Sequence, residues 1–75
     1  MSDVNAEAVA WLERFSAALG VAPPTAEDVE TLLAVAGHAA HSSHRQAAPV
    51  ACWLAARAGL TPRQALAAAQ ALDPA

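Results

Sequence analysis

The sequence predicts an all-α fold in which four helices are joined by short connections. Three observations support this expectation. Alanine, the strongest helix former, supplies 23 of the 75 residues,; the larger apolar residues recur at helical spacing; and capping residues, glycines and prolines stand where these stretches begin and end. Because no connection is long enough to separate two domains, residues 1–75 are expected to form a single helical domain with mostly antiparallel neighbouring helices.

The first helix is expected to begin after a cap at Ser2 or Asp3 and to end at Gly20,. Its apolar residues follow the i, i+4, i+7 and i+8 spacing of one helix face. We expect this face to be buried in the core, and its members are Val4, Ala8, Trp11, Leu12, Phe15 and Leu19.

A second helix follows the rigid connection "VAPP". Thr25 and Asp28 form the capping pattern T-x-x-D, which marks the start of a helix,. The helix is expected to run from about Ala26 to about Ser43. Its predicted core stripe consists of Val29, Leu32, Leu33, Ala36 and Ala40.

The third helix is located by Pro49, because a proline inside a helix removes a hydrogen bond and clashes with the preceding turn,. The chain is therefore expected to break at residues 44–48, and Pro49 then lies in the first turn of a helix that reaches Ala58. Gly59 is the expected left-handed terminator. The residues predicted to face inward are Val50, Trp53 and Leu54.

The stretch "LTPRQ" marks the start of the fourth helix. Thr61 is the expected cap, Pro62 suits the first helical position, and Gln64 completes a capping box. This helix is expected to end at about Leu72, ahead of Asp73 and Pro74.

The core that such helices can build is thin. Val, Leu, Phe, Trp and Met together number only 18, and a chain of this length buries only about 60% of the surface of its unfolded form. We therefore expect the domain to form a homodimer, or to dock on a larger protein, through alanine-lined helix faces.

Charge and composition argue against several classes of protein. A net charge of −3 and scattered arginines do not suit nucleic-acid binding, which needs a basic stripe,. No apolar run is long enough for a membrane span, and the beginning of the sequence has no signal-peptide pattern. The single cysteine, Cys52, agrees with a reducing compartment,. The expected location is the cytoplasm.

The segment "HAAHSSHR", residues 38–45, contains all three histidines of the chain and one of its four arginines. On a helical wheel with about 100° per residue, measured from Val29, three of these side chains share the face opposite the core stripe, and His44 borders the stripe. The three residues on the opposite face are His38, His41 and Arg45.

A metal site is one hypothesis for this segment. Histidines three residues apart on a helix can meet one ion, and neutral imidazole is a good ligand for zinc, copper or nickel. The donor set would be His38, His41 and His44, with Cys52 as a further ligand. The alternative is that these histidines are solvated on an exposed face.

An anion site is the second hypothesis. His41 and Arg45 are i, i+4 neighbours, and the third helix begins just after them, so its free N–H groups and dipole could face the same place. His41, Arg45 and Pro49 are therefore the predicted residues for a phosphate, a carboxylate or a partner protein. The alternative is a surface ion pair of Arg45 with Glu7 or Glu13. No catalytic residue, enzymatic activity or cofactor is expected, since Cys52 has no base beside it in the sequence.

Three short patterns follow one another from the second helix into the third: A-H-x-x-x-R at Ala40, His41 and Arg45, A-A-P at 47–49, and an apolar run around Trp53. In these patterns, over roughly residues 9–60, the chain resembles an actinobacterial family of small helical domains of unknown function. Members of that family occur alone or linked to molybdopterin-guanine dinucleotide biosynthesis proteins of the nucleotidyltransferase type.

The resemblance implies a role near molybdenum-cofactor maturation, and it favours His41 and Arg45 over the three-histidine cluster. His38 and His44 have no clear counterpart in the family, and Gln46 stands where the family tends to have proline.

Three functions stay open at this point. The first is a non-enzymatic accessory or interaction module, connected by the resemblance to molybdenum-cofactor maturation, in which His41 and Arg45 contact an anionic small molecule or a molybdenum-cofactor protein. The second is a histidine-based metal carrier or sensor. The third is a structural homodimer that needs no ligand.

Overall fold

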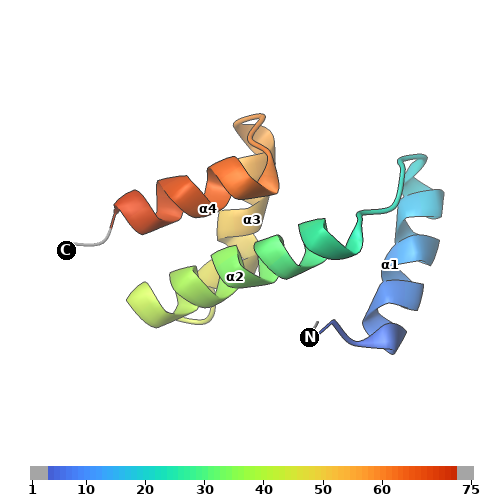
Figure 1. Ribbon diagram of the computed structural model, residues 1–75, viewed down its shortest axis with the longest axis horizontal. Helices are drawn as coiled ribbons and strands as arrows, with labels where there is room; N and C mark the ends of the chain where they lie inside the picture. Colours follow the sequence, from blue (N-terminus) through green and yellow to red (C-terminus); the bar gives the residue numbers. More distant parts are fainter. Residues whose placement is uncertain (1–3, 73–75) are drawn as a thin grey trace. The chain divides into compact units, whose positions relative to one another are not determined.

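The computed structural model describes residues 4–72, and these residues form four α-helices and no strand. In chain order the helices are α1 (Ala6–Leu19), α2 (Ala26–Ser42), α3 (Ala47–Arg57) and α4 (Pro62–Ala71) (Figure 1). The all-α prediction is confirmed. The three expected breaks overlap the connections between the helices, although Ala47 and Ala48, expected in the second break, belong to α3.

Helix α1 begins later than predicted. Its N-cap is Asn5, whose Oδ1 accepts hydrogen bonds from the backbone N–H groups of Glu7 at 2.8 Å and Ala8 at 3.2 Å. The predicted caps, Ser2 and Asp3, lie outside the described residues. At the other end, Gly20 is the predicted terminator and takes the left-handed conformation, with φ 73°.

Capping boxes start two of the other helices as predicted. At α4, the Gln64 N–H donates to Thr61 Oγ1 at 3.2 Å and the Thr61 N–H donates to Gln64 Oε1 at 2.9 Å. At α2, Thr25 and Asp28 exchange the same pair of bonds, at 3.0 and 3.4 Å. Each box satisfies two backbone donors that a helix start leaves open.

The contacts divide the chain between Glu30 and Thr31 into two compact units. The first unit holds α1, the connection and the start of α2. The second holds the rest of α2 together with α3 and α4. We describe each unit by itself, and the single domain over residues 1–75 stays a prediction.

In the first unit, the predicted buried stripe of α1 is wrong for its largest members. Trp11 is 52% exposed and Phe15 46% exposed, and Leu19 is exposed as well, whereas Ser16 is buried. The Ser16 hydroxyl is satisfied locally, because it donates to the Leu12 carbonyl at 2.7 Å.

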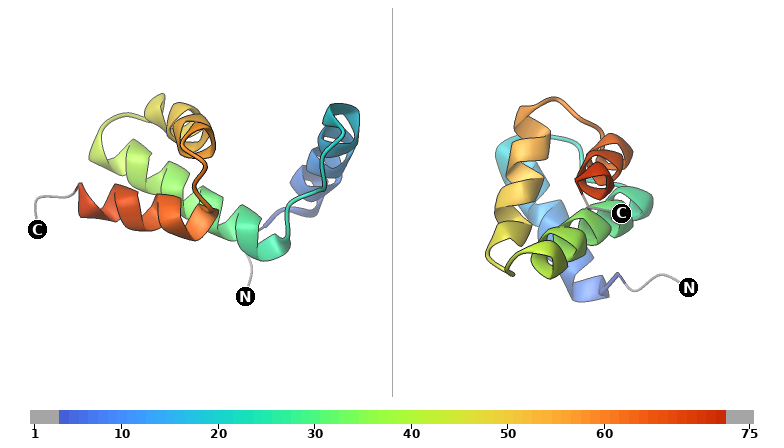
Figure 2. Two further views of the ribbon diagram at one scale, coloured as in Figure 1. Left: turned by 90° about the horizontal axis from the view of Figure 1, so that it is seen from above. Right: turned by 90° about the vertical axis from the view of Figure 1, so that its left-hand side faces the viewer.

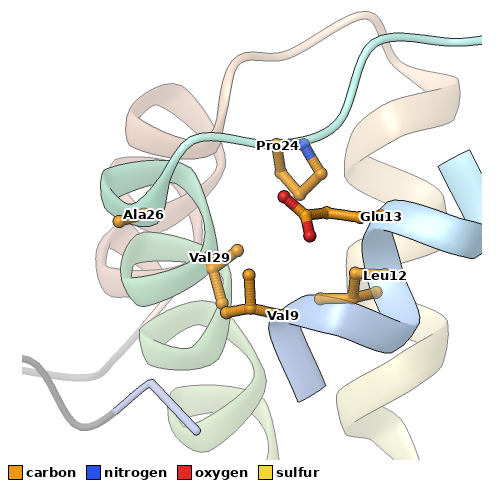
Figure 3. Close-up of a pocket in the computed structure, with 6 residues that line it drawn as sticks. All are labelled: Val9, Leu12, Glu13, Pro24, Ala26 and Val29. Atoms are coloured by element: carbon orange, nitrogen blue, oxygen red, sulfur yellow. The ribbon is translucent and has the colours of Figure 1, made fainter. Parts of the chain in front are cut away.

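The side of α1 that does pack carries smaller residues. Val9 and Leu12 lie opposite Val29 at the beginning of α2, with Pro24 of the connection above them (Figure 3). Together with Glu13 and Ala26 they line a hollow of only about 60 Å³. The aromatic side chains belong to the other side of the helix and are left to solvent.

In the second unit, α2 and α4 run side by side in the same direction and α3 crosses them (Figures 1 and 2). The expectation of mostly antiparallel neighbours is therefore wrong here. Gly59 follows the last residues of α3 in the left-handed conformation, with φ 77°, as predicted for its terminator. The N–H of Leu60 donates to the Ala55 carbonyl at 3.1 Å. The crossing of α3 lets α4 return along α2.

The core of the second unit is built from small side chains. Val35 is 2% exposed and Ala65 4% exposed, whereas the predicted core residue Leu33 is 55% exposed. The predicted inward residues of α3 are also exposed, and they are Val50, Trp53 and Leu54. The half-buried positions of α3 are Ala47, Ala48, Ala51, Cys52 and Ala55. Small residues let helix backbones approach closely, so here they face inward and the bulky residues face out.

Candidate functional site

His38 faces the interior of the second unit, contrary to the prediction. It is half-buried, with its Nε2 atom shielded from solvent. It lines a hollow of about 410 Å³ with Ser42 of α2, Ala51 of α3 and Ala69 of α4 among the other walls. The expected direction of the core was that of Val29, which packs in the first unit. The second unit packs on Val35, and His38 lies only about 60° from that residue.

The other two histidines are exposed. His41 lies in the last turn of α2, as predicted. His44 was predicted to border the core, but it lies in the turn after α2, where its Nδ1 accepts a hydrogen bond from the Gln46 N–H at 3.1 Å. This bond fixes the turn that leads into α3, so the imidazole of His44 has a structural task.

The start of α3 does not offer the free N–H groups that the anion hypothesis assumed. The Ala47 N–H donates to the His44 carbonyl at 2.8 Å and the Ala48 N–H to the Arg45 carbonyl at 3.1 Å. Pro49 has no N–H group. An anion at this point would therefore be bound by side chains and the helix dipole, and not by backbone donors at residues 46–48.

Arg45 is exposed in the turn before α3. Residues 31–72, the part of the second unit that the structure describes, contain no Asp or Glu. The same residues carry Arg45, Arg57 and Arg63. Residues 31–72 therefore carry an excess of positive charge.

The metal hypothesis has no geometric support among residues 4–72, where no three His, Cys, Asp or Glu side chains are placed to hold an ion. The Cys52 thiol points at the backbone of α2 and donates a weak hydrogen bond to the Leu32 carbonyl at 3.8 Å. It lines a different hollow from His38. Burial raises the pKa of this thiol, so it stays protonated and unreactive near neutral pH,.

The exposed side of α3 carries a surface that the sequence reasoning missed. We call it the outer face of α3 and define it as Pro49, Val50, Trp53 and Arg57, all of which are exposed. The Arg57 guanidinium carbon lies 5.0 Å from the centroid of the Trp53 ring, a cation–π contact,. The signal was present in the i, i+4 spacing of Trp53 and Arg57, but the tryptophan was interpreted as a core residue.

The sequence of the chain matches a known protein family over most of its length. A family model described as "Domain of unknown function (DUF6457)" matches residues 3–74. The chain belongs to this family. The DUF6457 match covers all four helices, so the resemblance to a small helical domain of unknown function is confirmed at that level. Neither a curated protein nor a solved structure matches the chain.

Among the described residues of this DUF6457 domain, no helix combines the length and apolar character that crossing a bilayer requires,.

Proposed function

We propose that this DUF6457 domain is a non-enzymatic accessory module that binds a partner protein through the outer face of α3. The single observation that carries the proposal is the exposed Trp53–Arg57 pair: the ring is 59% exposed and the guanidinium is stacked on it. Tryptophan and arginine are the residue types most enriched among the side chains that dominate binding energy at protein interfaces.

The pair gains strength when a partner covers it. A cation–π contact is worth about 0.5–1 kcal/mol at an exposed site and about 2 kcal/mol or more when water is excluded. Val50 and Pro49 extend the same face with apolar surface, so a partner would bury an aromatic anchor together with its apolar neighbours. An exposed pair of this kind contributes little to folding and much to binding.

Charge indicates the chemistry of the partner's surface. Because residues 31–72 carry three arginines and no carboxylate, an acidic surface would be steered toward them and would pair with Arg57 at one end of α3. His41 and Arg45, just before the other end, are the residues we propose to contact further carboxylates of the partner or a bound anionic group. Their side chains are exposed and available for this contact.

The partner we propose is a protein of molybdenum-cofactor maturation, of the molybdopterin-guanine dinucleotide nucleotidyltransferase type. The support for this choice is the family resemblance carried by His41, Arg45 and Pro49. The DUF6457 domain would then be an accessory to that protein, acting in the cytoplasm, with the chemistry supplied by the partner.

Isothermal titration of the chain with the nucleotidyltransferase from the same organism tests this proposal. Trp53→Ala should weaken binding by roughly 30-fold or more, because truncation of a central interface anchor typically costs at least about 2 kcal/mol. Trp11→Ala is the matched control, since Trp11 is also an exposed tryptophan but lies on α1. No binding by the wild type would contradict the choice of partner, and equal effects of the two variants would contradict the choice of surface.

A further inference from the structure

The second unit has an apolar groove on the side where α3 and α4 meet. It has a volume of about 380 Å³, and small side chains form most of its wall. The residues that matter below are Ala51, Leu54 and Ala55 of α3, Ala65 and Ala68 of α4, and Val35 of α2. A dry apolar cavity of about 150 Å³ in another protein accepts benzene, so this groove has room for large apolar side chains.

The first unit has the opposite feature, a row of large apolar side chains that are about half exposed. Trp11 and Phe15 are stacked on α1 with their ring centroids 4.9 Å apart and an interplanar angle of 26°. Leu19 follows four residues later and is 59% exposed. We call these three residues the aromatic ridge. Their i, i+4, i+8 spacing places them in one row along the helix.

The two units also carry opposite charge. Residues 4–30 hold five carboxylates and a single arginine, Arg14, whereas residues 31–72 hold three arginines and no carboxylate. Glu7 lies four residues before Trp11, in the same row as the ridge,. Arg57 lies in the last turn of α3, three residues after Leu54, which lines the groove. When the ridge of one copy enters the groove of another, large apolar side chains contact small ones. The acidic residues of the first copy then approach the basic residues of the second.

We propose that the α3–α4 groove of one copy receives the aromatic ridge of a second copy of this chain. Each chain has one ridge and one groove, so a two-fold arrangement gives two identical contacts and closes as a dimer. The contact buries the residues that the thin core of a single chain leaves exposed. This inference does not depend on the proposed function, since Trp53, the anchor of that proposal, does not line the groove.

Sedimentation of the full chain over a concentration series tests the inference, with circular dichroism to confirm that each variant keeps its helices. The wild type should reach the mass of two chains. Ala68→Phe fills the groove and should weaken dimerisation by roughly 30-fold or more. Ala67→Phe is the matched control: Ala67 is the preceding exposed alanine of α4, does not line the groove, and its substitution should leave the dimer intact.

A second pair of variants tests the ridge. Trp11→Ala should weaken dimerisation strongly, whereas Trp53→Ala, which removes the exposed tryptophan of the outer face of α3, should not. A mixture of Ala68→Phe with Trp11→Ala should contain two-chain species, because the first variant keeps the ridge and the second keeps the groove.

Three results would overturn the inference. A wild-type chain that stays monomeric at every concentration would mean that the groove receives its own chain's ridge or another partner. Equal effects of Ala68→Phe and Ala67→Phe on dimerisation would show that the groove is not the dimer contact. Equal effects of Trp11→Ala and Trp53→Ala would separate it from the ridge, and none of these results bears on whether the nucleotidyltransferase binds.

Discussion

The guanidinium of Arg57 stacks on the Trp53 ring at 5.0 Å, on a side of α3 that the rest of the second unit leaves exposed. Tertiary packing does not impose this contact, since both side chains are exposed. It orders two long side chains on the helix surface before any partner arrives, which lowers the entropy that binding must otherwise supply.

Removing the Arg57 side chain should leave the fold nearly unchanged. Arg57→Ala is expected to lower the free energy of unfolding by no more than about 1 kcal/mol, the usual value of an exposed cation–π contact. Urea denaturation followed by circular dichroism measures this change. Arg57→Lys is the control that keeps the charge but loses the planar stacking group. A loss of several kcal/mol for Arg57→Ala would mean that the pair is part of the core.

The stability of the second unit should be sensitive to truncation of Val35 and less sensitive to truncation of Leu33. Val35→Ala is expected to cost about 1–3 kcal/mol of unfolding free energy, because it removes buried methyl groups and leaves a cavity. Leu33→Ala removes more side-chain volume at a position that is 55% exposed, and should cost less. If chemical denaturation ranks these two variants in the opposite order, our assignment of the core is incorrect.

The stability of the start of α4 should depend on the hydroxyl group of Thr61. Thr61→Ala removes the acceptor of the Gln64 N–H and should destabilise the domain by about 0.5–2 kcal/mol,. Thr61→Ser keeps the hydroxyl and should retain most of the stability. Thermal melts of the two variants and the wild type decide the matter, and equal losses in both variants would show that the methyl group matters more than the cap.

Cys52 should react with alkylating reagents at higher pH than an exposed cysteine does. Burial disfavours the thiolate and raises the pKa of the thiol,. The rate of alkylation by iodoacetamide should therefore reach its half-maximum at a higher pH in the folded protein than in urea. By the same linkage, the contribution of this thiol to stability is complete below its unfolded pKa and is lost as the pH rises above it. A lower midpoint in the folded protein would contradict the placement of Cys52 against α2.

Local signals were sufficient to predict most of the helix ends, and the exception is the start of α1, where Asn5 is the cap. Thr25, Thr61 and Gly20 act through bonds to residues a few positions away, so their effect can be deduced from the sequence next to them. Burial depends on distant residues, and there the prediction was wrong. The helical spacing of the large apolar residues suggested that Trp11 and Trp53 belong in the core, but smaller side chains take that place: Val9 and Leu12 on α1, and alanines on α3.

The histidine segment illustrates the same limit. His38 was assigned to the solvent face because α2 was treated as having one buried stripe, referred to Val29. The helix instead contributes to two units, and Val35 sets the buried direction in the second. His41 and Arg45 were correctly predicted to be exposed, and their role in binding stays a prediction.

The most direct test of the proposed function uses the two tryptophans as internal probes. The chain has only two, Trp11 and Trp53, so a ¹H–¹⁵N spectrum has two indole N–H signals, which Trp53→Ala assigns. Adding the nucleotidyltransferase to the labelled chain should shift or broaden the Trp53 indole signal and leave the Trp11 signal at its position for the same total concentration of chain. A response confined to Trp11, or no response of Trp53 when binding is saturated, would contradict partner binding through the outer face of α3.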